Sequence, residues 1–230
     1  MATAMEQAFG AIGARVIEET FGGVFEIGLQ EIAGQETYQL KYPWSDEFDI
    51  ETPDVRPKHR HLVLDVSSRR FDTIGRYLCG HDERHWFVAT LPIEERTKSV
   101  RGAMEALKPE IVRRAQKRRG VKHRLHRRRT EAYVRQGEWF FLPRPMMHVG
   151  EKAVAGGELV RPGGKPHLAE WIYRPNANET FVRGAVSHPD HATLYLQVWH
   201  RVVLNNEARV ASERHVARRV DSLARMTYLD

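Results

Sequence analysis

The chain has 230 residues, of which 41% are hydrophobic and 29% charged, enough for one large domain or two small ones with buried cores. Its single cysteine, Cys79, excludes an intramolecular disulfide, and no window approaches the roughly 18 apolar residues of a membrane span. The net charge is +6, yet residues 111–130 contain ten Lys or Arg and no acid, so the remainder sums to about −4.

The first twenty residues include three glutamates and lack a continuous apolar run, so we expect no secretory signal. Together with the lone cysteine, this predicts a cytoplasmic protein without a membrane partner.

The N-terminal half begins with an expected helix over residues 4–20, where apolar side chains recur at spacings of three and four. The apolar run 24–32 fits either a strand or a helix. Residues 41–60 contain three prolines and many charges, which predicts an extended loop. Residues 62–66 are typical of a strand.

The middle of the chain combines a hairpin with two helices. Residues 77–79 and 86–89 predict two strands joined by the loop 80–85. Residues 97–107 predict a helix, and Pro109 suits the first position of a second, basic helix.

The C-terminal half is expected to be rich in strands, with a loop at the Gly- and Pro-rich residues 149–166 and a final helix over residues 207–226. The expected strands are residues 139–142, 168–173, 179–186, 193–198 and 201–204.

The fold class predicted from these elements is α+β: a small antiparallel sheet with helices, followed by a compact β-barrel-like domain and a C-terminal helix. The expected divisions are residues 1–95, a basic helical connection over 96–133, and a β-rich domain with its closing helix over 134–230.

The basic segment carries the main functional hypothesis. Its density of like charge favours a polyanion, and phosphate backbones supply one. Arg outnumbers Lys, which suits bidentate phosphate contacts. The predicted nucleic-acid-binding residues are Arg113, Arg114, Lys117, Arg118, Arg119, Lys122, Arg124, Arg127, Arg128 and Arg129.

RNA is slightly preferred to DNA, because aromatic residues that could stack on bases accompany the Arg-rich segment and no helix-turn-helix or zinc-finger pattern is present. Two other interpretations of the segment stay open: a solvated linker between domains, and a contact for an acidic protein partner in a larger assembly.

Two turns share a His-acid-His pattern. In the first, Cys79, His81 and His85 offer three potential zinc ligands, but their spacing matches no standard zinc motif, so we expect no metal or other cofactor and keep zinc as the alternative. The neighbouring acids could equally bond the imidazoles in an ordinary hairpin turn.

The second turn contains His188, Asp190 and His191, in which the carboxylate could orient an imidazole for general acid–base chemistry. If the two turns converge, His81 and His85 would join them in a metal- or His-dependent hydrolase acting on nucleic acid. The simpler interpretation is a Pro-Asp turn between strands, so whether the chain is an enzyme stays open.

Three adjacent rings, Trp139, Phe140 and Phe141, cannot share one face of a strand. We therefore expect Phe140 to face opposite to the other two, with at least one face buried. Trp171, Tyr173 and Trp199 could remain exposed as stacking platforms for bases, but burial in the core is the commoner fate of such rings.

Residues 135–143, RQGEWFFLP, resemble the opening of small uncharacterised bacterial and phage proteins that begin RQGD followed by an apolar strand and proline. The pieces GGKPHLAE, SHPDHATL and WHRVVLNNE fall where those proteins have Gly/His, His-x-x-His and final-strand segments. The similarity covers roughly the last 100 residues and departs at Glu138, where Asp is usual. It implies a compact β-domain and no particular activity.

Overall fold

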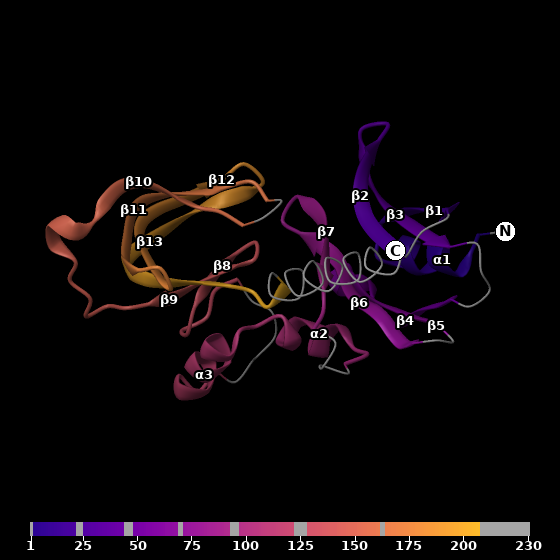
Figure 1. The fold of residues 1–230 in the computed structure, drawn as a ribbon, viewed down its shortest axis with the longest axis horizontal. Helices are drawn as coiled ribbons and strands as arrows, with labels where there is room; N and C mark the ends of the chain where they lie inside the picture. Colours follow the sequence, from indigo (N-terminus) through magenta and orange to yellow (C-terminus); the bar gives the residue numbers. More distant parts are fainter. Residues whose placement is uncertain are drawn as a thin grey trace, which may run out of the picture. The chain divides into compact units, whose positions relative to one another are not determined.

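The computed structural model describes residues 2–21, 25–43, 48–68, 71–92, 97–121, 128–161 and 164–207. Of the described residues, 57% lie in strands and 17% in helices. They form three sheets and three α-helices (Figure 1). The predicted α+β class is therefore wrong: the described chain is mostly β. The predicted C-terminal helix over 207–226 lies almost entirely outside the described residues.

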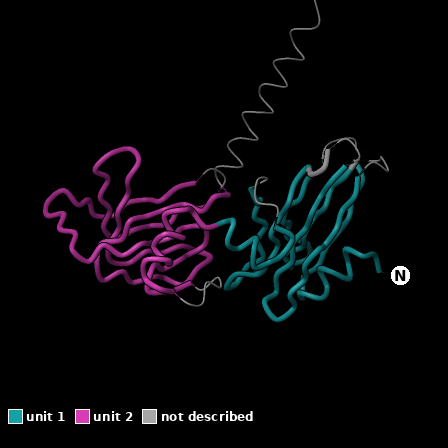
Figure 2. The backbone as a smooth tube through the Cα atoms, turned by 90° about the horizontal axis from the view of Figure 1, so that it is seen from below, with its two compact units in different colours: residues 1–107, 209–230 teal, residues 108–208 magenta. Residues whose placement is uncertain are grey.

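The chain divides into two compact units, with the division between Leu107 and Lys108 (Figure 2). The two helices expected in the basic connection therefore belong to different units. Within the described residues, no helix is long and apolar enough to cross a membrane.

The first unit contains two sheets. One has the order β1-β3-β2, with β1 parallel to β3, and the other is antiparallel with the order β4-β5-β6-β7. Its elements are α1 (Ala4–Ala11), β1 (Arg15–Phe21), β2 (Glu26–Ile32), β3 (Gln35–Pro43), β4 (Phe48–Arg56), the 3-10 turn η1 (Pro57–His59), β5 (His61–Ser68), β6 (Phe71–Asp82), β7 (His85–Thr90) and α2 (Val100–Ala106).

Both faces of β5, an inner strand of the four-stranded sheet, are buried, and its alternate residues face opposite sides. On β5, Leu62 and Leu64 join a core with Phe9 of α1 and Tyr38 of β3. Val63 between them packs with α2 on the other face. The strand predicted at 62–66 and the hairpin of β6 and β7 are confirmed.

Two predictions for the first unit are wrong. The N-terminal helix ends at Ala11, because Gly13 at φ 81° turns the chain into β1. The loop expected at residues 41–60 instead contains the end of β3 and all of β4. Pro53 is tolerated there since β4 is an edge strand and its pairing with β5 is irregular between Glu51 and Asp54.

The second unit is one six-stranded antiparallel sheet with the order β10-β11-β12-β13-β9-β8, accompanied by α3. Its elements are α3 (Glu110–Arg118), β8 (Val134–Gln136), β9 (Trp139–Pro143), the 3-10 turn η2 (Gly150–Lys152), β10 (Val154–Leu159), β11 (His167–Asn176), β12 (Glu179–His188) and β13 (His191–Leu204). Strand β10 falls in the predicted loop, and the two strands expected at 193–204 are one.

The sheet curls around a single core, since one hydrophobic cluster contains side chains from all six strands. Trp139 and Phe141 of β9 belong to that cluster, whereas Phe140 belongs to a second cluster with Val112 and Ala115 of α3. The predicted alternation of the three rings is confirmed, and both faces of β9 are buried.

Candidate functional site

The basic segment does not form a helix that is cationic all round. Helix α3 buries Val112, Ala115 and Gln116, and the first two pack with Phe140 and Leu142 of β9. Arg113, Arg114, Lys117 and Arg118 lie on the other side of the helix, and Arg119 is its C-cap. The exposed ones are Arg114, Lys117, Arg118 and Arg119.

Part of this charge is balanced locally. Glu110 accepts from Arg113 Nε at 3.1 Å and from Arg114 Nε at 2.8 Å, which lowers the pKa of the Glu110 carboxyl, chiefly through Arg114. Arg128 and Arg129 are exposed just before β8. Lys122, Arg124 and Arg127 lie outside the described residues.

The outer face of the curled sheet holds both α3 and exposed rings. On β13, Leu196 and Val202 face the inner core, whereas Val203 packs with the α3 cluster. Tyr195 precedes Leu196 and Trp171 precedes Ile172, both of the inner core, so the two rings point away from that core; Tyr195 is 73% and Trp171 39% exposed. The structure therefore combines an ordered cationic helix and exposed aromatic rings on one sheet face.

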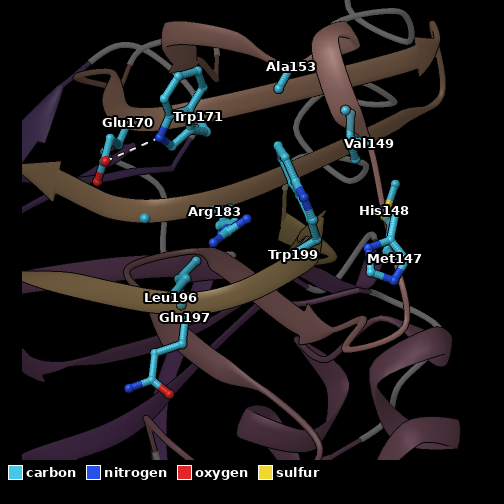
Figure 3. A pocket seen from close by; sticks show the side chains of 12 residues that line it. Met147, His148, Val149, Ala153, Glu170, Trp171, Arg183, Leu196, Gln197 and Trp199 are labelled. Carbon is cyan, nitrogen blue, oxygen red and sulfur yellow. Dashed lines mark hydrogen bonds between the residues drawn. The ribbon is translucent and has the colours of Figure 1, made fainter.

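A pocket of about 710 Å³ lies on this unit, lined by Trp171, Arg183 and Trp199 together with the loop that contains His148 (Figure 3). One wall is held by Glu170, whose carboxylate accepts from Trp171 Nε1 at 3.2 Å and from the Ala185 N–H at 2.8 Å. Two indoles beside a guanidinium suit a planar base that carries a phosphate.

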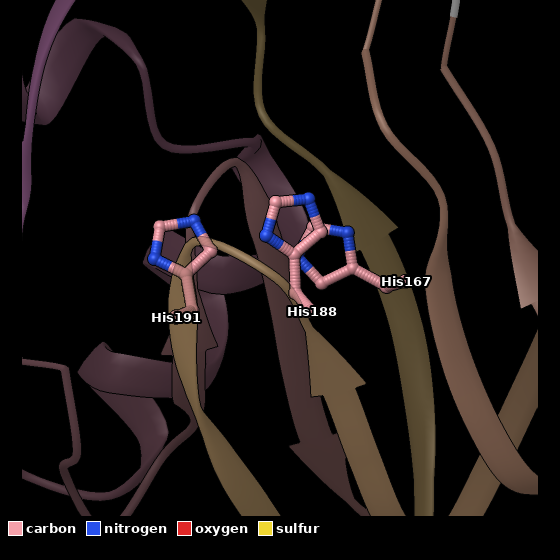
Figure 4. A group of neighbouring side chains, drawn as sticks. All are labelled: His167, His188 and His191. Carbon is pink, nitrogen blue, oxygen red and sulfur yellow. The ribbon is translucent and has the colours of Figure 1, made fainter.

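Three histidines meet at neighbouring strand ends of the second unit (Figure 4). His167 begins β11, His188 ends β12 and His191 begins β13. One ring nitrogen of each lies within 4.8 Å of the others, and the His167 and His188 rings stack with centroids 4.1 Å apart. Among the described residues, this is the one group of three or more His, Cys, Asp or Glu with such convergence.

The most deeply buried histidine of the cluster, His167, is uncharged. His167 is 1% exposed, and neither of its ring nitrogens has a hydrogen-bond partner in the described part of the chain. Burial, reinforced by His188 and His191, lowers the pKa of His167 to about 3. Burial and then His191 also lower the pKa of His188, whose Nδ1 accepts from the Asp190 N–H at 3.1 Å.

The carboxylates beside the cluster are bound to cations. Asp190 accepts from Lys165 Nζ at 2.8 and 3.1 Å, and Glu138 pairs with Arg161 at 2.7 Å. The acid–base hypothesis, in which the Asp190 carboxylate orients an imidazole, stays a prediction. Asp190 also donates its backbone N–H to His188 Nδ1.

The β8–β9 turn covers the cluster with a residue that has no side chain. Gly137 adopts φ 54°, and a Cβ there would lie 3.0 Å from His191 Nε2 and 3.7 Å from His167 Nε2. Gln136 beside it is buried and donates to the Ala192 carbonyl at 2.6 Å, which fixes the turn to the start of β13.

The first His-acid-His turn has a different setting. His85 Nδ1 bonds Glu36 of β3 at 2.8 Å, and the His81 ring packs edge-on against Trp86 at 4.9 Å. Burial and the nearby Arg60 lower the pKa of His81. Cys79 is completely buried, which raises the pKa of its thiol. These three residues do not form a ligand cluster among the described residues.

The two turns belong to different units, each described by itself, so the predicted convergence of His81 and His85 with His188 and His191 stays a prediction. Sequence reasoning missed His167. The one signal in the sequence was that GGKPHLAE, which contains His167, and SHPDHATL, which contains the other two, belong to the same stretch of similarity. The structure brings the three histidines together at one end of the sheet.

Comparison with known protein families, curated proteins and solved structures finds no match for this chain. The similarity to proteins that begin RQGD stays a prediction.

Proposed function

We propose that this chain is a cytoplasmic nucleic-acid-binding protein that holds phosphates on the outward face of α3. The observation that carries the proposal is the orientation of this helix. Because Val112 and Ala115 are buried against β9, Lys117 and Arg118 are held outward on a folded support, and Arg119 is exposed at the C-cap of the helix. A positioned row of cations loses less conformational entropy on binding than a flexible segment does.

The distribution of charge supports the same function. Residues 108–208 contain 19 Lys or Arg against 9 Asp or Glu, a net charge of +10, whereas residues 1–107 contain 12 against 18, a net charge of −6. A strongly basic unit attracts polyanions, and release of their counterions favours binding at low salt.

Single-stranded RNA is the preferred form of nucleic acid in this proposal. Trp171 and Tyr195 are partly or largely exposed on the face that also holds α3, and Arg183 pairs with Trp171 across β11 and β12. Unpaired bases can stack on such rings while the backbone follows the cations.

The test replaces Lys117, Arg118 and Arg119 together with Gln and measures affinity for a mixed-sequence single-stranded RNA at several salt concentrations. Three lost phosphate contacts should lower the slope of log affinity against log salt by about 2, at roughly 0.7 per contact. Affinity at low salt should fall as well.

The matched control replaces three exposed cations of the first unit, Lys58, Arg84 and Arg101, with Gln. It changes the net charge by the same amount, so a specific role for α3 requires this variant to keep the original slope. An equal decrease of the slope in both variants would mean that the RNA responds only to the net charge of the protein. An unchanged slope in the α3 variant would show that this helix does not bind phosphate, and an acidic protein partner would then replace nucleic acid as the favoured ligand.

A further inference from the structure

The three-histidine cluster is not part of the proposed phosphate site on α3, and its ligand atoms converge as in no other group of three His, Cys, Asp or Glu in the described residues. We infer that His167, His188 and His191 form a binding site for one divalent transition-metal ion, zinc foremost, with a fourth coordination position open to water or an anion.

His167 supplies the first reason. A buried imidazole almost always makes hydrogen bonds, because an unsatisfied polar atom costs free energy when it leaves water. His167 is 1% exposed, and neither of its ring nitrogens has such a partner in the described residues. Its neighbours in space are His188 and His191, whose rings lie 4.1 and 5.9 Å away between centroids. A metal bound between the three rings would supply a partner for one of these two nitrogens.

The donors select the class of ion. Neutral imidazoles are ligands for zinc, copper and nickel, whereas magnesium and calcium prefer oxygen. The nearest carboxylates are bound to cations, Asp190 to Lys165 and Glu138 to Arg161. Three nitrogen ligands with one open position are the arrangement of reactive zinc sites, while structural sites fill all four positions.

The geometry needs a modest adjustment. The three ring nitrogens lie within 4.8 Å of one another, and tetrahedral zinc with bonds of 2.0–2.1 Å requires about 3.3 Å between them. Small ring rotations close this gap. His188 Nδ1 accepts a hydrogen bond from the Asp190 N–H, and a nitrogen lone pair binds one partner at a time. Metal binding therefore requires the His188 ring to give up this hydrogen bond.

The support is rigid and leaves room for a ligand. Each histidine stands at the end of a strand in one sheet, and His188 and His191 are paired in the ladder of β12 and β13. Gly137 lies over the His191 and His167 rings, where any larger residue would place a Cβ 3.0 Å from His191 Nε2. Because Gly137 has no side chain, the β8–β9 turn leaves space over the two rings for a ligand bound to the metal.

The test measures zinc binding by the untagged full-length chain in competition with a chromophoric chelator, using zinc alone as the probe. We expect one zinc per chain. Cobalt, used in place of zinc, should give the intense visible absorption of a four-coordinate ion. Ring-nitrogen NMR signals of three histidines should shift together when zinc is added, a readout that needs no substitution.

His188→Gln and His191→Gln should each lower zinc affinity at least about tenfold, because each removes one of three ligands. Both residues are only half-buried, so these variants should fold even where His167→Gln does not. His85→Gln, in the similar turn of the first unit, is the control and should bind zinc as the original chain does. Absence of stoichiometric zinc binding, or equal affinity in His191→Gln and His85→Gln, would overturn the proposal. The RNA-binding test above is independent of either outcome.

Discussion

The two His-acid-His turns use the same residue types and differ in what a neighbouring strand brings to them. Both connect consecutive antiparallel strands, β6 with β7 and β12 with β13. In the first, Glu36 of β3 accepts from both His85 and the Trp86 N–H, at 2.8 Å each. In the second, the neighbour is His167 of β11, and three imidazoles meet.

The chemistry of a His-acid-His turn is therefore not defined by the turn alone. A carboxylate from the next sheet converts one histidine into a structural hydrogen-bond donor, and a third imidazole converts the other pair into a potential ligand set. Charged side chains also differ between the units: Arg76 and Asp65 of the first form a buried ion pair, whereas Lys117 and Arg118 of α3 in the second are exposed.

The largest expected effect concerns the buried pair of the first unit. Arg76 Nη2 bonds Asp65 at 3.0 Å, and the residues are 5% and 7% exposed. Arg76→Leu should therefore destabilise the protein by about 3–5 kcal/mol, because it leaves a buried carboxylate without its main partner. Urea denaturation measures this loss. Adding Asp65→Leu should recover much of it, and failure to do so would mean that packing, not charge, dominates.

A smaller effect should follow from removing the support of the cationic helix in the second unit. Leu142→Ala creates a cavity under α3, with an expected loss of about 2–5 kcal/mol in unfolding free energy. RNA affinity should fall too, since the cations lose their fixed positions. Leu142→Met keeps the volume and should change both quantities little. Full RNA affinity in a folded Leu142→Ala protein would contradict the role given to helix packing.

Acid should weaken the second unit through a buried histidine outside the cluster. Burial lowers the pKa of His200, whose Nδ1 donates to the Val198 carbonyl at 2.7 Å. The unfolded chain then binds the proton first as pH falls below about 6.5, so stability decreases from there down to the lowered pKa. His200→Gln should give a shallower dependence of unfolding free energy on pH in this range. A steeper or identical dependence would show that His200 does not contribute.

The smallest expected effect is that of His85→Gln in the first turn. The His85–Glu36 pair is about half exposed, and such pairs contribute roughly 0–1 kcal/mol. Glu36 also keeps its bond from the Trp86 N–H. Thermal unfolding should therefore shift by no more than a few degrees. A loss comparable to that of Arg76→Leu would make this turn as structurally important as the buried pair and would erase the distinction between them.

Strands with strong local patterns could be predicted from the sequence. The apolar run 62–66 predicted a strand, and the three rings from Trp139 predicted a strand together with the alternation of its faces. Prediction failed where context decides: β4 contains Pro53, which only an edge position makes acceptable. The helix start was predicted, but its early end depended on the left-handed backbone of Gly13.

The candidate sites divide in the same way. The exposed cations of α3 could be predicted from charge alone, but the buried face of that helix required knowing that Phe140 and Leu142 lie beneath it. His188 and His191 are close in sequence and were predicted as a pair. His167 comes from another strand, and only the register of β11 against β12 brings it to them.

The hydroxyl of Tyr38 has a consequence for how the first unit opens. Tyr38 is completely buried on β3, and its hydroxyl shares one proton between the carbonyls of Gly80 and Phe87, at 3.2 and 2.9 Å, on two strands of the other sheet. The two sheets cannot separate without breaking this hydrogen bond and exposing the core that they share. Amide protons of both sheets should therefore exchange with solvent through one shared opening event, and the unit should lose its protection as a single cooperative block.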